Sequence, residues 1–239
     1  MEFCLIAHRA GPGRFPEQSI ASAREALKNG ADMAEMDVQF TSDGVPVICH
    51  DPNTLRMFGE DRLCSDMTSE HFLSLRHTAH REYPSHSLAD VLASGVRPLL
   101  LHQKCSGEQL RTMMRVINDY GYGKHVVIGV QHPADVALIR EMLPETTVLA
   151  FMPQVEDTDA FLAAGADVIR LWEGWVSKDR IDRIHGAGRR VWIMAGECTA
   201  EGVGYTTEES FSSWIRMGVD GILINDIPWA MPLCGRQGS

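Results

Sequence analysis

The residue types best suited to acid-base and metal chemistry gather near the start of the chain. They are two histidines, an arginine and two carboxylates: His8, Arg9, Glu35, Asp37 and His50. Because side chains alternate along a strand, Glu35 and Asp37 point to the same face of an apolar run. Two carboxylates on one face of a buried strand are costly unless a cation lies between them, and a divalent metal is the simplest such cation. The flanking histidines could then transfer protons.

The composition limits the classes of function. The chain has 239 residues, of which 44% are hydrophobic and 23% are charged, as expected for a globular protein with a large core. Its net charge of -10 argues against bulk electrostatic attraction to nucleic acid or to an anionic membrane surface. A small anionic substrate remains compatible, because a site can be locally positive. We therefore expect a small-molecule substrate, no nucleic-acid partner, and a monomer or homodimer.

The sequence shows no evident targeting or membrane segment. Residues 1–7 lack the basic leader of a signal peptide and run directly into an apolar stretch. No apolar run approaches the ~20 residues that a transmembrane helix needs. The six cysteines include no C-x-x-C pair, which is typical of reduced, mostly buried thiols. These features predict a cytoplasmic protein without a membrane span.

The elements that must position the candidate residues alternate between strands and helices. Apolar runs predict eight strands, at 3–8, 33–39, 96–101, 125–130, 147–152, 167–172, 190–195 and 219–224. Helical patterns separate them, at 17–29, 87–94, 106–120, 133–142, 157–164, 178–187 and 207–217. Eight βα units in one chain predict an α/β fold of the TIM (β/α)8 barrel type rather than an open sheet. We expect one domain over residues 1–239.

A polar segment interrupts the alternation after the second strand. A turn at 41–44 leads into a short extended run at 45–49, and residues 52–85 show little periodicity apart from one helix near 68–76. Such long irregular segments often carry function. We interpret 52–85 as an inserted lid or specificity segment. Its histidines have no metal-ligand spacing, so we expect them at the surface: His71, His77, His80 and His86.

A barrel places its active site at the carboxyl ends of its strands, and the candidate residues fall there. His8 and Arg9 close the first strand, and His50 closes the extended run after the second. His102 and Lys104 close the third strand, and the polar residues Gln131, Glu173 and Asn225 follow later strands. The sequence therefore predicts one polar site at one end of the barrel.

The order of these motifs resembles the glycerophosphodiester phosphodiesterase family. That family opens with the motifs His-Arg-Gly, Pro-Glu-Asn-Thr, Glu-Leu-Asp-Val, Asp-Gly and His-Asp. The corresponding residues here are His8-Arg9-Ala10, Pro16-Glu17-Gln18-Ser19, Glu35-Met36-Asp37-Val38, Asp43-Gly44 and His50-Asp51. Residues 218–228 also resemble the family's last strand. Each motif alone is weak, but the ordered set is specific and the resemblance spans the chain.

The resemblance implies hydrolysis of glycerophosphodiesters to glycerol 3-phosphate and an alcohol. His8 and His50 would be the catalytic acid-base pair. Glu35 and Asp37 would hold a divalent cation, Mg²⁺ or Ca²⁺ in this family, which neutralises charge developing on the phosphate. Lys104 would bind the phosphate as a point charge. Alternatively, Lys104 is only a counterion inside the barrel, and the two carboxylates are neutralised without a metal.

Further substrate contacts are implied by the same resemblance. Arg9 would bind the phosphodiester through its planar fork, and Glu17 would orient Arg9 or reach the metal site. Trp192 could stack on the substrate, but a place in the buried core fits its sequence position equally well. Trp172 and Trp175 are further candidates for the mouth of the barrel.

The main departure from the family pattern lies on the third predicted strand. The family reads Glu-x-Lys there and supplies a third metal carboxylate, whereas this chain has His102 followed by Gln103 and Lys104. Alternation points His102 into the same mouth as the other ligands, and an imidazole would shift the metal preference toward Mn²⁺, Co²⁺ or Zn²⁺. In the other interpretation His102 contacts only phosphate or water. The alternative function is a non-catalytic phosphodiester-binding barrel that has lost the strand 3 carboxylate.

Overall fold

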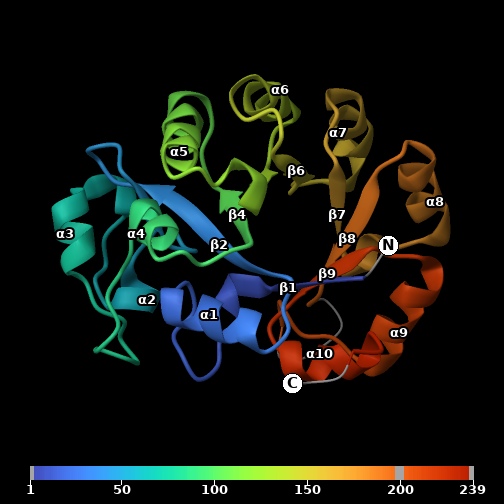
Figure 1. The fold of residues 1–239 in the computed structure, drawn as a ribbon, viewed down its shortest axis with the longest axis horizontal. Coiled ribbons are helices and arrows are strands. Elements are labelled where there is room, and N and C mark those ends of the chain that lie inside the picture. Colours follow the sequence, from blue (N-terminus) through green and yellow to red (C-terminus); the bar gives the residue numbers. More distant parts are fainter. Residues whose placement is uncertain (1–2, 197–201, 237–239) are drawn as a thin grey trace.

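Within the part of the chain that the computed structural model describes, residues 3–196 and 202–236, eight parallel strands close into a barrel (Figure 1). In ring order they are β1 (Cys4–Ala7), β2 (Met33–Phe40), β4 (Leu99–Gln103), β5 (Val126–Val130), β6 (Thr147–Ala150), β7 (Val168–Trp172), β8 (Arg190–Met194) and β9 (Gly221–Ile224). Strand β1 pairs with both β2 and β9, which closes the ring. The predicted TIM barrel is confirmed, and each predicted strand matches an observed one within a few residues.

Helices surround the barrel (Figure 1). They are α1 (Ile20–Lys28), α4 (Leu88–Ala93), α5 (Gly107–Asp119), α6 (Pro133–Met142), α7 (Thr158–Ala164), α8 (Lys178–Gly186), α9 (Glu208–Met217) and α10 (Ile227–Leu233). The sequence patterns predict all of these except α10. That helix contains Pro228 and Pro232, which hide its helical pattern. Pro228 is tolerated because it lies in the first turn, where the missing N–H has no intrahelical partner.

Helix α1 begins later than predicted, and the difference matters for the site. Gln18 has a left-handed backbone with φ of 59°, and Ser19 is extended, so neither residue can be helical. The Ser19 side chain accepts a hydrogen bond from the Ser22 N–H and caps the helix. As a result, Gln18 lies outside α1 and its side chain is directed toward β2.

The segment after β2 has a small hydrophobic core of its own. Strand β3 (Pro46–Ile48) pairs antiparallel to β2, outside the ring. Helices α2 (Leu55–Phe58) and α3 (Ser69–Ser74) follow, and only the second was predicted. They enclose a cluster of buried residues: Val47, Cys49, Met57, Phe58, Cys64, Met67 and Phe72. Residues 52–85 are therefore packed rather than open, while a role as lid or specificity segment stays a prediction.

The surface location expected for the histidines of this segment is wrong for His77. His77 is only 3% exposed, and its ring lies 4.8 Å from that of Phe58. Burial lowers the pKa of His77 to about 4. The local sequence is polar, so only the folded segment reveals that this imidazole is enclosed.

The interior of the barrel is apolar below its carboxyl end. One buried cluster fills it: Ile6, Leu100, Val127, Leu149, Phe151, Val168, Trp192, Met194 and Leu223. A larger cluster packs the outer face of the strands against the helices. Because the barrel is filled, polar groups of its interior can gather only where the strands end.

Two expectations about the chain as a whole can be compared with its described residues. Among them, no helix has the length and apolar character needed to cross a membrane. Five cysteines lie in the described ranges and are free thiols: Cys4, Cys49, Cys64, Cys105 and Cys234. Cys198 lies outside the described residues.

Candidate active site

A cavity of about 460 Å³ opens at the carboxyl end of the barrel. Its lining includes seven polar residues singled out in the sequence: His8, Arg9, Glu35, Asp37, His50, His102 and Lys104. Gln131, a polar residue that follows a predicted strand, also lines the cavity, together with residues that the sequence patterns did not single out: Phe151, Met152, Pro153, Arg170, Met194 and Val203. The predicted site residues thus meet at one place, although they come from distant parts of the chain.

His8 lies at the end of β1 and is held by an asparagine after β9. Its Nδ1 is 2.8 Å from Asn225 Oδ1, and the Asn225 amide is itself oriented because Nδ2 donates to the Val203 carbonyl oxygen at 3.1 Å. Burial and the nearby Arg9 guanidinium lower the pKa of His8 to about 3. The imidazole is therefore neutral at neutral pH. Its Nδ1–H donates to Asn225, which leaves Nε2 as a proton acceptor.

Glu35 and Asp37 lie on the same face of β2, as alternation requires, and each is 1% exposed. Glu35 accepts a hydrogen bond from the Arg9 backbone N–H at 2.6 Å. Gln18 holds Asp37 twice, since its Nε2 donates to Asp37 Oδ2 at 2.7 Å and its Oε1 accepts from the Asp37 N–H at 2.9 Å. The left-handed turn before α1 therefore fixes one of the two carboxylates.

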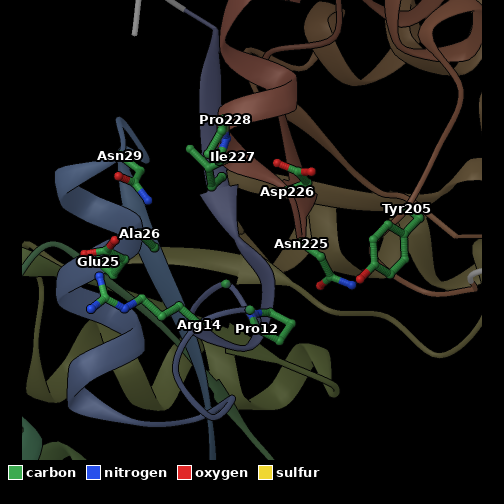
Figure 2. A pocket seen from close by; sticks show the side chains of 12 residues that line it. Pro12, Arg14, Glu25, Ala26, Asn29, Tyr205, Asn225, Asp226, Ile227 and Pro228 are labelled. Atoms are coloured by element: carbon green, nitrogen blue, oxygen red, sulfur yellow. The ribbon is translucent and has the colours of Figure 1, made fainter. Parts of the chain in front are cut away.

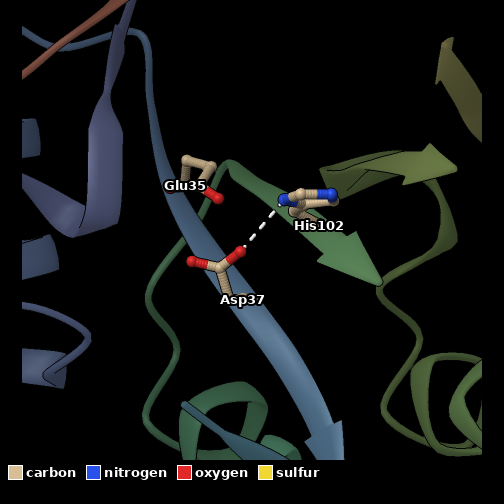
Figure 3. Close-up of side chains that lie close together, drawn as sticks. All are labelled: Glu35, Asp37 and His102. Atoms are coloured by element: carbon tan, nitrogen blue, oxygen red, sulfur yellow. Dashed lines mark ion pairs between the residues drawn. The ribbon is translucent and has the colours of Figure 1, made fainter. Parts of the chain in front are cut away.

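His102 and Lys104 reach Asp37 from the neighbouring strand β4. His102 Nδ1 is 3.0 Å from Asp37 Oδ1 (Figure 3). Lys104 Nζ is 2.8 Å from the same oxygen. The parallel register brings them together, because Asp37 is directly opposite His102. Figure 3 shows Glu35 and Asp37 on β2 facing the imidazole on β4.

The charges in this cluster are unevenly balanced. Burial and the neighbouring Asp37 carboxylate raise the pKa of Glu35 well above its ordinary value. Burial also acts to raise the pKa of Asp37, but its close contacts with His102 and with the Lys104 ammonium hold it below the ordinary range. Burial lowers the pKa of His102 to about 4, so its imidazole is neutral near pH 7. The cluster therefore combines an ionised carboxylate, a protonatable carboxyl group and a neutral imidazole.

These residues fit a divalent cation. Glu35, Asp37 and His102 each offer one ligand atom within 4.8 Å of the others. Asp37 Oδ1 is buried and has ion-pair contacts, but none of them has hydrogen-bond geometry. Two carboxylate oxygens and a neutral imidazole nitrogen are ligand types used by Mn²⁺, Co²⁺ and Zn²⁺. A cation would supply the contact that this buried oxygen lacks.

His50 belongs to a second network on the same side of the cavity. Its Nδ1 is 2.6 Å from Asp51 Oδ1, and its Nε2 is 3.0 Å from an Arg9 nitrogen. Asp51 in turn pairs with Arg56 on α2, and Glu17 contacts both arginines. Glu17 thus contacts Arg9 and is not among the residues lining the cavity, while its role in orienting Arg9 stays a prediction. Arg56 and Asp51 tie this network to the inserted segment.

The opposite wall of the cavity is apolar and aromatic. Phe151 stacks on His102 with ring centroids 3.8 Å apart and an interplanar angle of 8°. Trp172 and Met194 complete this wall, and Arg170 adds a single positive charge. Trp172 was a candidate for the mouth, and it lines the cavity, whereas Trp175 does not.

Trp192 lies in the filled interior of the barrel. It is 1% exposed and is not a lining residue of the cavity. Met194, two residues later on the same face of β8, reaches the cavity instead. Trp192 was a candidate because of the family resemblance, and a pattern of apolar residues cannot give the level at which its strand meets the mouth. Its position supports the buried-core interpretation.

A second cavity of about 280 Å³ lies beside the first, between the loop after β1, helix α1 and the start of α10 (Figure 2). Asn225 lines it, and Figure 2 shows this side chain close to Tyr205. Arg14 and Asp226 also line it. Because Asn225 orients His8, this second cavity adjoins the site through that side chain.

Sequence reasoning missed Gln18 and Arg170 as members of the site, and it noted Gln131 and Asn225 only as polar residues that follow strands. Gln18 holds Asp37, Asn225 orients His8, Gln131 lies 3.3 Å from His102 Nε2, and Arg170 lines the far wall. The polar residues Gln18, Gln131 and Asn225 each follow a strand or precede a helix, which is a usable but weak signal. Arg170 interrupts an apolar strand and was the clearest signal available.

Comparison with known proteins gives the family. The model of the glycerophosphoryl diester phosphodiesterase family matches residues 8–228. Glycerophosphodiester phosphodiesterase 1 from Rattus norvegicus is 41% identical over 102 residues, which are 41% of this chain and 30% of that protein. A glycerophosphodiester phosphodiesterase from Caldanaerobacter subterraneus is 37% identical over 75 residues, 31% of each chain. The matched part thus spans about a third of these relatives' length.

Solved structures agree on the fold. A glycerophosphoryl diester phosphodiesterase structure from Silicibacter pomeroyi has a TM-score of 0.82 at 18% identity and covers 100% of this chain and 96% of its own. An Oleispira antarctica phosphodiesterase in complex with the product sn-glycerol-3-phosphate has a TM-score of 0.82 at 17% identity, covering 97% and 96%. At these identities the likeness concerns the fold alone.

Proposed function

The chain belongs to the glycerophosphoryl diester phosphodiesterase family, and from that premise we propose that it hydrolyses a glycerophosphodiester to glycerol 3-phosphate and an alcohol. The observation that carries this proposal is the convergence of two histidines and two carboxylates on one cavity. The relatives named as glycerophosphodiester phosphodiesterases support the reaction class. The bound product in the Oleispira antarctica structure supports the substrate class.

His8 is the base in this reaction. It is neutral, and its Nδ1–H is engaged by Asn225, so Nε2 is available to take a proton from the attacking hydroxyl. That hydroxyl belongs either to water or to the substrate itself. In the substrate it is the hydroxyl next to the phosphodiester group. In the second case a cyclic phosphate forms first, and water then opens it.

His50 donates a proton to the leaving alkoxide. Asp51 engages its Nδ1, so Nε2 faces Arg9 and the cavity. When Arg9 turns toward the phosphate, His50 Nε2 is free to take up a proton from solvent, and the resulting imidazolium, held at Nδ1 by Asp51, passes that proton to the leaving alkoxide. Arg9 binds the phosphate through its planar fork and Lys104 binds it as a point charge. Both residues lie on the side of the cavity that holds the histidines.

Glu35, Asp37 and His102 would hold the divalent cation. When bound, such a cation neutralises charge that develops on the phosphate oxygens. A set of two carboxylates and an imidazole carries one negative charge less than three carboxylates, and nitrogen is a softer ligand than oxygen. We therefore expect weaker binding of Ca²⁺ and Mg²⁺ and a preference for Mn²⁺, Co²⁺ or Zn²⁺.

The role of His102 can be tested by calorimetric titration of the metals. His102→Glu should strengthen Mg²⁺ and Ca²⁺ binding relative to Mn²⁺ and Zn²⁺. Gln109→Glu, which adds the same charge on the exposed face of α5, is the control and should leave the preference unchanged. An unchanged preference in His102→Glu would mean that the imidazole contacts phosphate or water instead.

Turnover is the decisive measurement for the reaction. The purified protein is incubated with glycerophosphocholine, glycerophosphoethanolamine and bis(p-nitrophenyl) phosphate in Mg²⁺, Ca²⁺, Mn²⁺, Co²⁺ and Zn²⁺. We expect release of glycerol 3-phosphate from at least one glycerophosphodiester. Ligand-dependent stabilisation without turnover in any combination would contradict the enzyme and favour the non-catalytic binding barrel.

A further inference from the structure

A buried glutamate follows β7 and lies beside the loop after β8, residues 195–207. Glu173 is 7% exposed, and the parallel register of β7 and β8 places it next to the residues that follow β8. Its Oε2 accepts a hydrogen bond from the Gly196 backbone N–H at 3.1 Å, and its Oε1 accepts one from the Thr206 hydroxyl at 3.1 Å. Gly196 and Thr206 lie near the two ends of the loop. One carboxylate therefore joins these ends.

The same loop holds Asn225, which follows β9. The Asn225 N–H donates to the Gly204 carbonyl oxygen at 2.7 Å, and the Gly204 N–H donates to the Ala195 carbonyl oxygen at 2.9 Å. The Asn225 side chain donates from Nδ2 to the Val203 carbonyl oxygen at 3.1 Å. Position 204 requires glycine, because its φ is +92° and a Cβ there would overlap Asn225 Oδ1. Asn225 is thus held by two loop residues that lie between the anchor points of Glu173.

These contacts determine which nitrogen of His8 carries the proton. Since Asn225 Nδ2 is engaged by a carbonyl oxygen, Oδ1 is the atom that faces His8 Nδ1 at 2.8 Å. An amide oxygen only accepts, so Nδ1 carries the hydrogen of the neutral ring and Nε2 is left unprotonated. If the amide turned over, its NH2 group would face Nδ1, and the proton would move to Nε2 and block base catalysis. The loop therefore controls the tautomer of His8 through the direction of one amide.

We propose that Glu173 is a positioning residue for the base His8. By joining the two ends of the loop after β8, it keeps Asn225 in the orientation that leaves His8 Nε2 free to accept a proton. This inference rests on the proposed phosphodiester hydrolysis and adds a residue that lies outside the lining of the cavity. Because Glu173 acts through the Asn225 amide, its loss should lower kcat rather than raise KM.

The test observes the tautomer of His8 directly by NMR. In protein labelled with ¹⁵N-histidine, two-bond ¹H–¹⁵N spectra near pH 7 distinguish a protonated ring nitrogen from an unprotonated one, and His8→Gln identifies the His8 signals. The wild type should show a protonated Nδ1 and an unprotonated Nε2. In Asn225→Ala the proton should be shared between both nitrogens. Glu173→Gln should shift part of the way in the same direction, because an amide offers one acceptor oxygen where the carboxylate offers two.

Steady-state kinetics measure the consequence for the reaction. Asn225→Ala should lower kcat by about 10- to 100-fold and Glu173→Gln by about 3- to 10-fold, as expected from losing partners that orient a functional histidine, while KM stays within about twofold. Thr206→Val removes one of the two anchors and should resemble Glu173→Gln, whereas Thr206→Ser keeps the hydroxyl and should resemble the wild type. Glu141→Gln, which changes an exposed glutamate on α6, is the matched control and should leave both constants unchanged.

The spectra and the kinetics together decide the inference. An unchanged His8 tautomer in Glu173→Gln, or a loss of kcat without a change of tautomer, would mean that Glu173 only supports the fold and would overturn it. A protonated Nε2 in the wild type would overturn it as well. If Glu173→Gln does not fold, Thr206→Val and Thr206→Ser decide. The NMR measurement needs no turnover, so a wild type that hydrolyses no glycerophosphodiester would contradict the proposed function, while the spectra of Glu173→Gln would still decide this inference.

Discussion

The two walls of the cavity are built on different principles. The charged wall comes from β1, β2, β4 and the loop after β3, and it consists of His8, Arg9, Glu35, Asp37, His50, His102 and Lys104. The aromatic wall comes from β6, β7 and β8, and it consists of Phe151, Met152, Arg170, Trp172 and Met194. Side chains of the charged wall are joined by hydrogen bonds and ion pairs, whereas those of the aromatic wall pack on one another.

This difference separates two tasks. Proton transfer and charge neutralisation need groups whose protonation state and direction are set, and the hydrogen bonds of His8 to Asn225 and of Asp37 to Gln18 set them. Choice of substrate needs a defined shape, which the packed rings of the aromatic wall could provide. The comparison predicts that substitutions in the charged wall change mainly kcat or metal binding, and those in the aromatic wall change mainly KM or preference.

The largest effect should follow from removing the base. His8→Ala should lower kcat by about 10²- to 10⁴-fold, because no other group replaces the Nε2 acceptor, while KM changes little. Steady-state kinetics with the best glycerophosphodiester measure both constants. A large rise in KM with an unchanged kcat would show that His8 only binds substrate, and the division between the walls would fail.

The next effect concerns the support of the metal ligands. Gln18→Ala removes both hydrogen bonds that hold Asp37, and loss of such a supporting partner typically weakens metal binding by about 10- to 100-fold. Calorimetric titration with Mn²⁺ measures this affinity. Gln109→Ala, on the exposed face of α5, is the matched control. Unchanged affinity in Gln18→Ala would mean that Asp37 is not a ligand.

A smaller effect is expected in the aromatic wall. Trp172→Ala should raise KM roughly 2- to 10-fold, as expected from losing one aromatic contact, while kcat stays within about twofold. The same kinetic assay separates the two constants. If kcat fell as far as it does in His8→Ala, the aromatic wall would take part in the chemistry and the distinction would be wrong.

The smallest effect concerns the pH dependence of stability through His77. It tests whether a lowered pKa alone shows that a histidine belongs to the charged wall. His77 has a pKa lowered by burial to about 4, yet it lies in the packed segment and lines no part of the catalytic cavity. In the unfolded chain His77 binds a proton near pH 6.5, so between pH 6.5 and 4 the unfolded state binds more protons. Stability contributed by the neutral imidazole is therefore complete above pH 6.5 and is lost on acidification.

Thermal unfolding at several pH values measures this contribution. The melting temperature of the wild type should fall as the pH is lowered from 6.5 to 4, and that of His77→Phe should fall less. Near neutral pH the kcat of His77→Phe should equal that of the wild type. Parallel melting curves in the two proteins would contradict burial of a neutral His77. A loss of kcat in His77→Phe would connect the inserted segment to the reaction.

The barrel and most of the charged wall were predictable from the sequence. The eight strands follow from apolar runs separated by helical patterns, and strand alternation alone places Glu35 and Asp37 on one face. Strand ends then place His8 and Lys104 at one mouth, whereas His50 reaches the same cavity because β3 folds back antiparallel along β2. These inferences succeed because each depends on residues that are close together in the chain, with the closed topology supplying the rest.

Tertiary structure decided the contacts between distant segments. The orientation of His8 depends on Asn225, 217 residues later, and Asp37 is held by Gln18 because a left-handed turn delays the start of α1. The level of each strand relative to the mouth places Trp192 in the interior and Met194 in the cavity. Local patterns show only which face a side chain takes, whereas register and packing determine its depth and its partner.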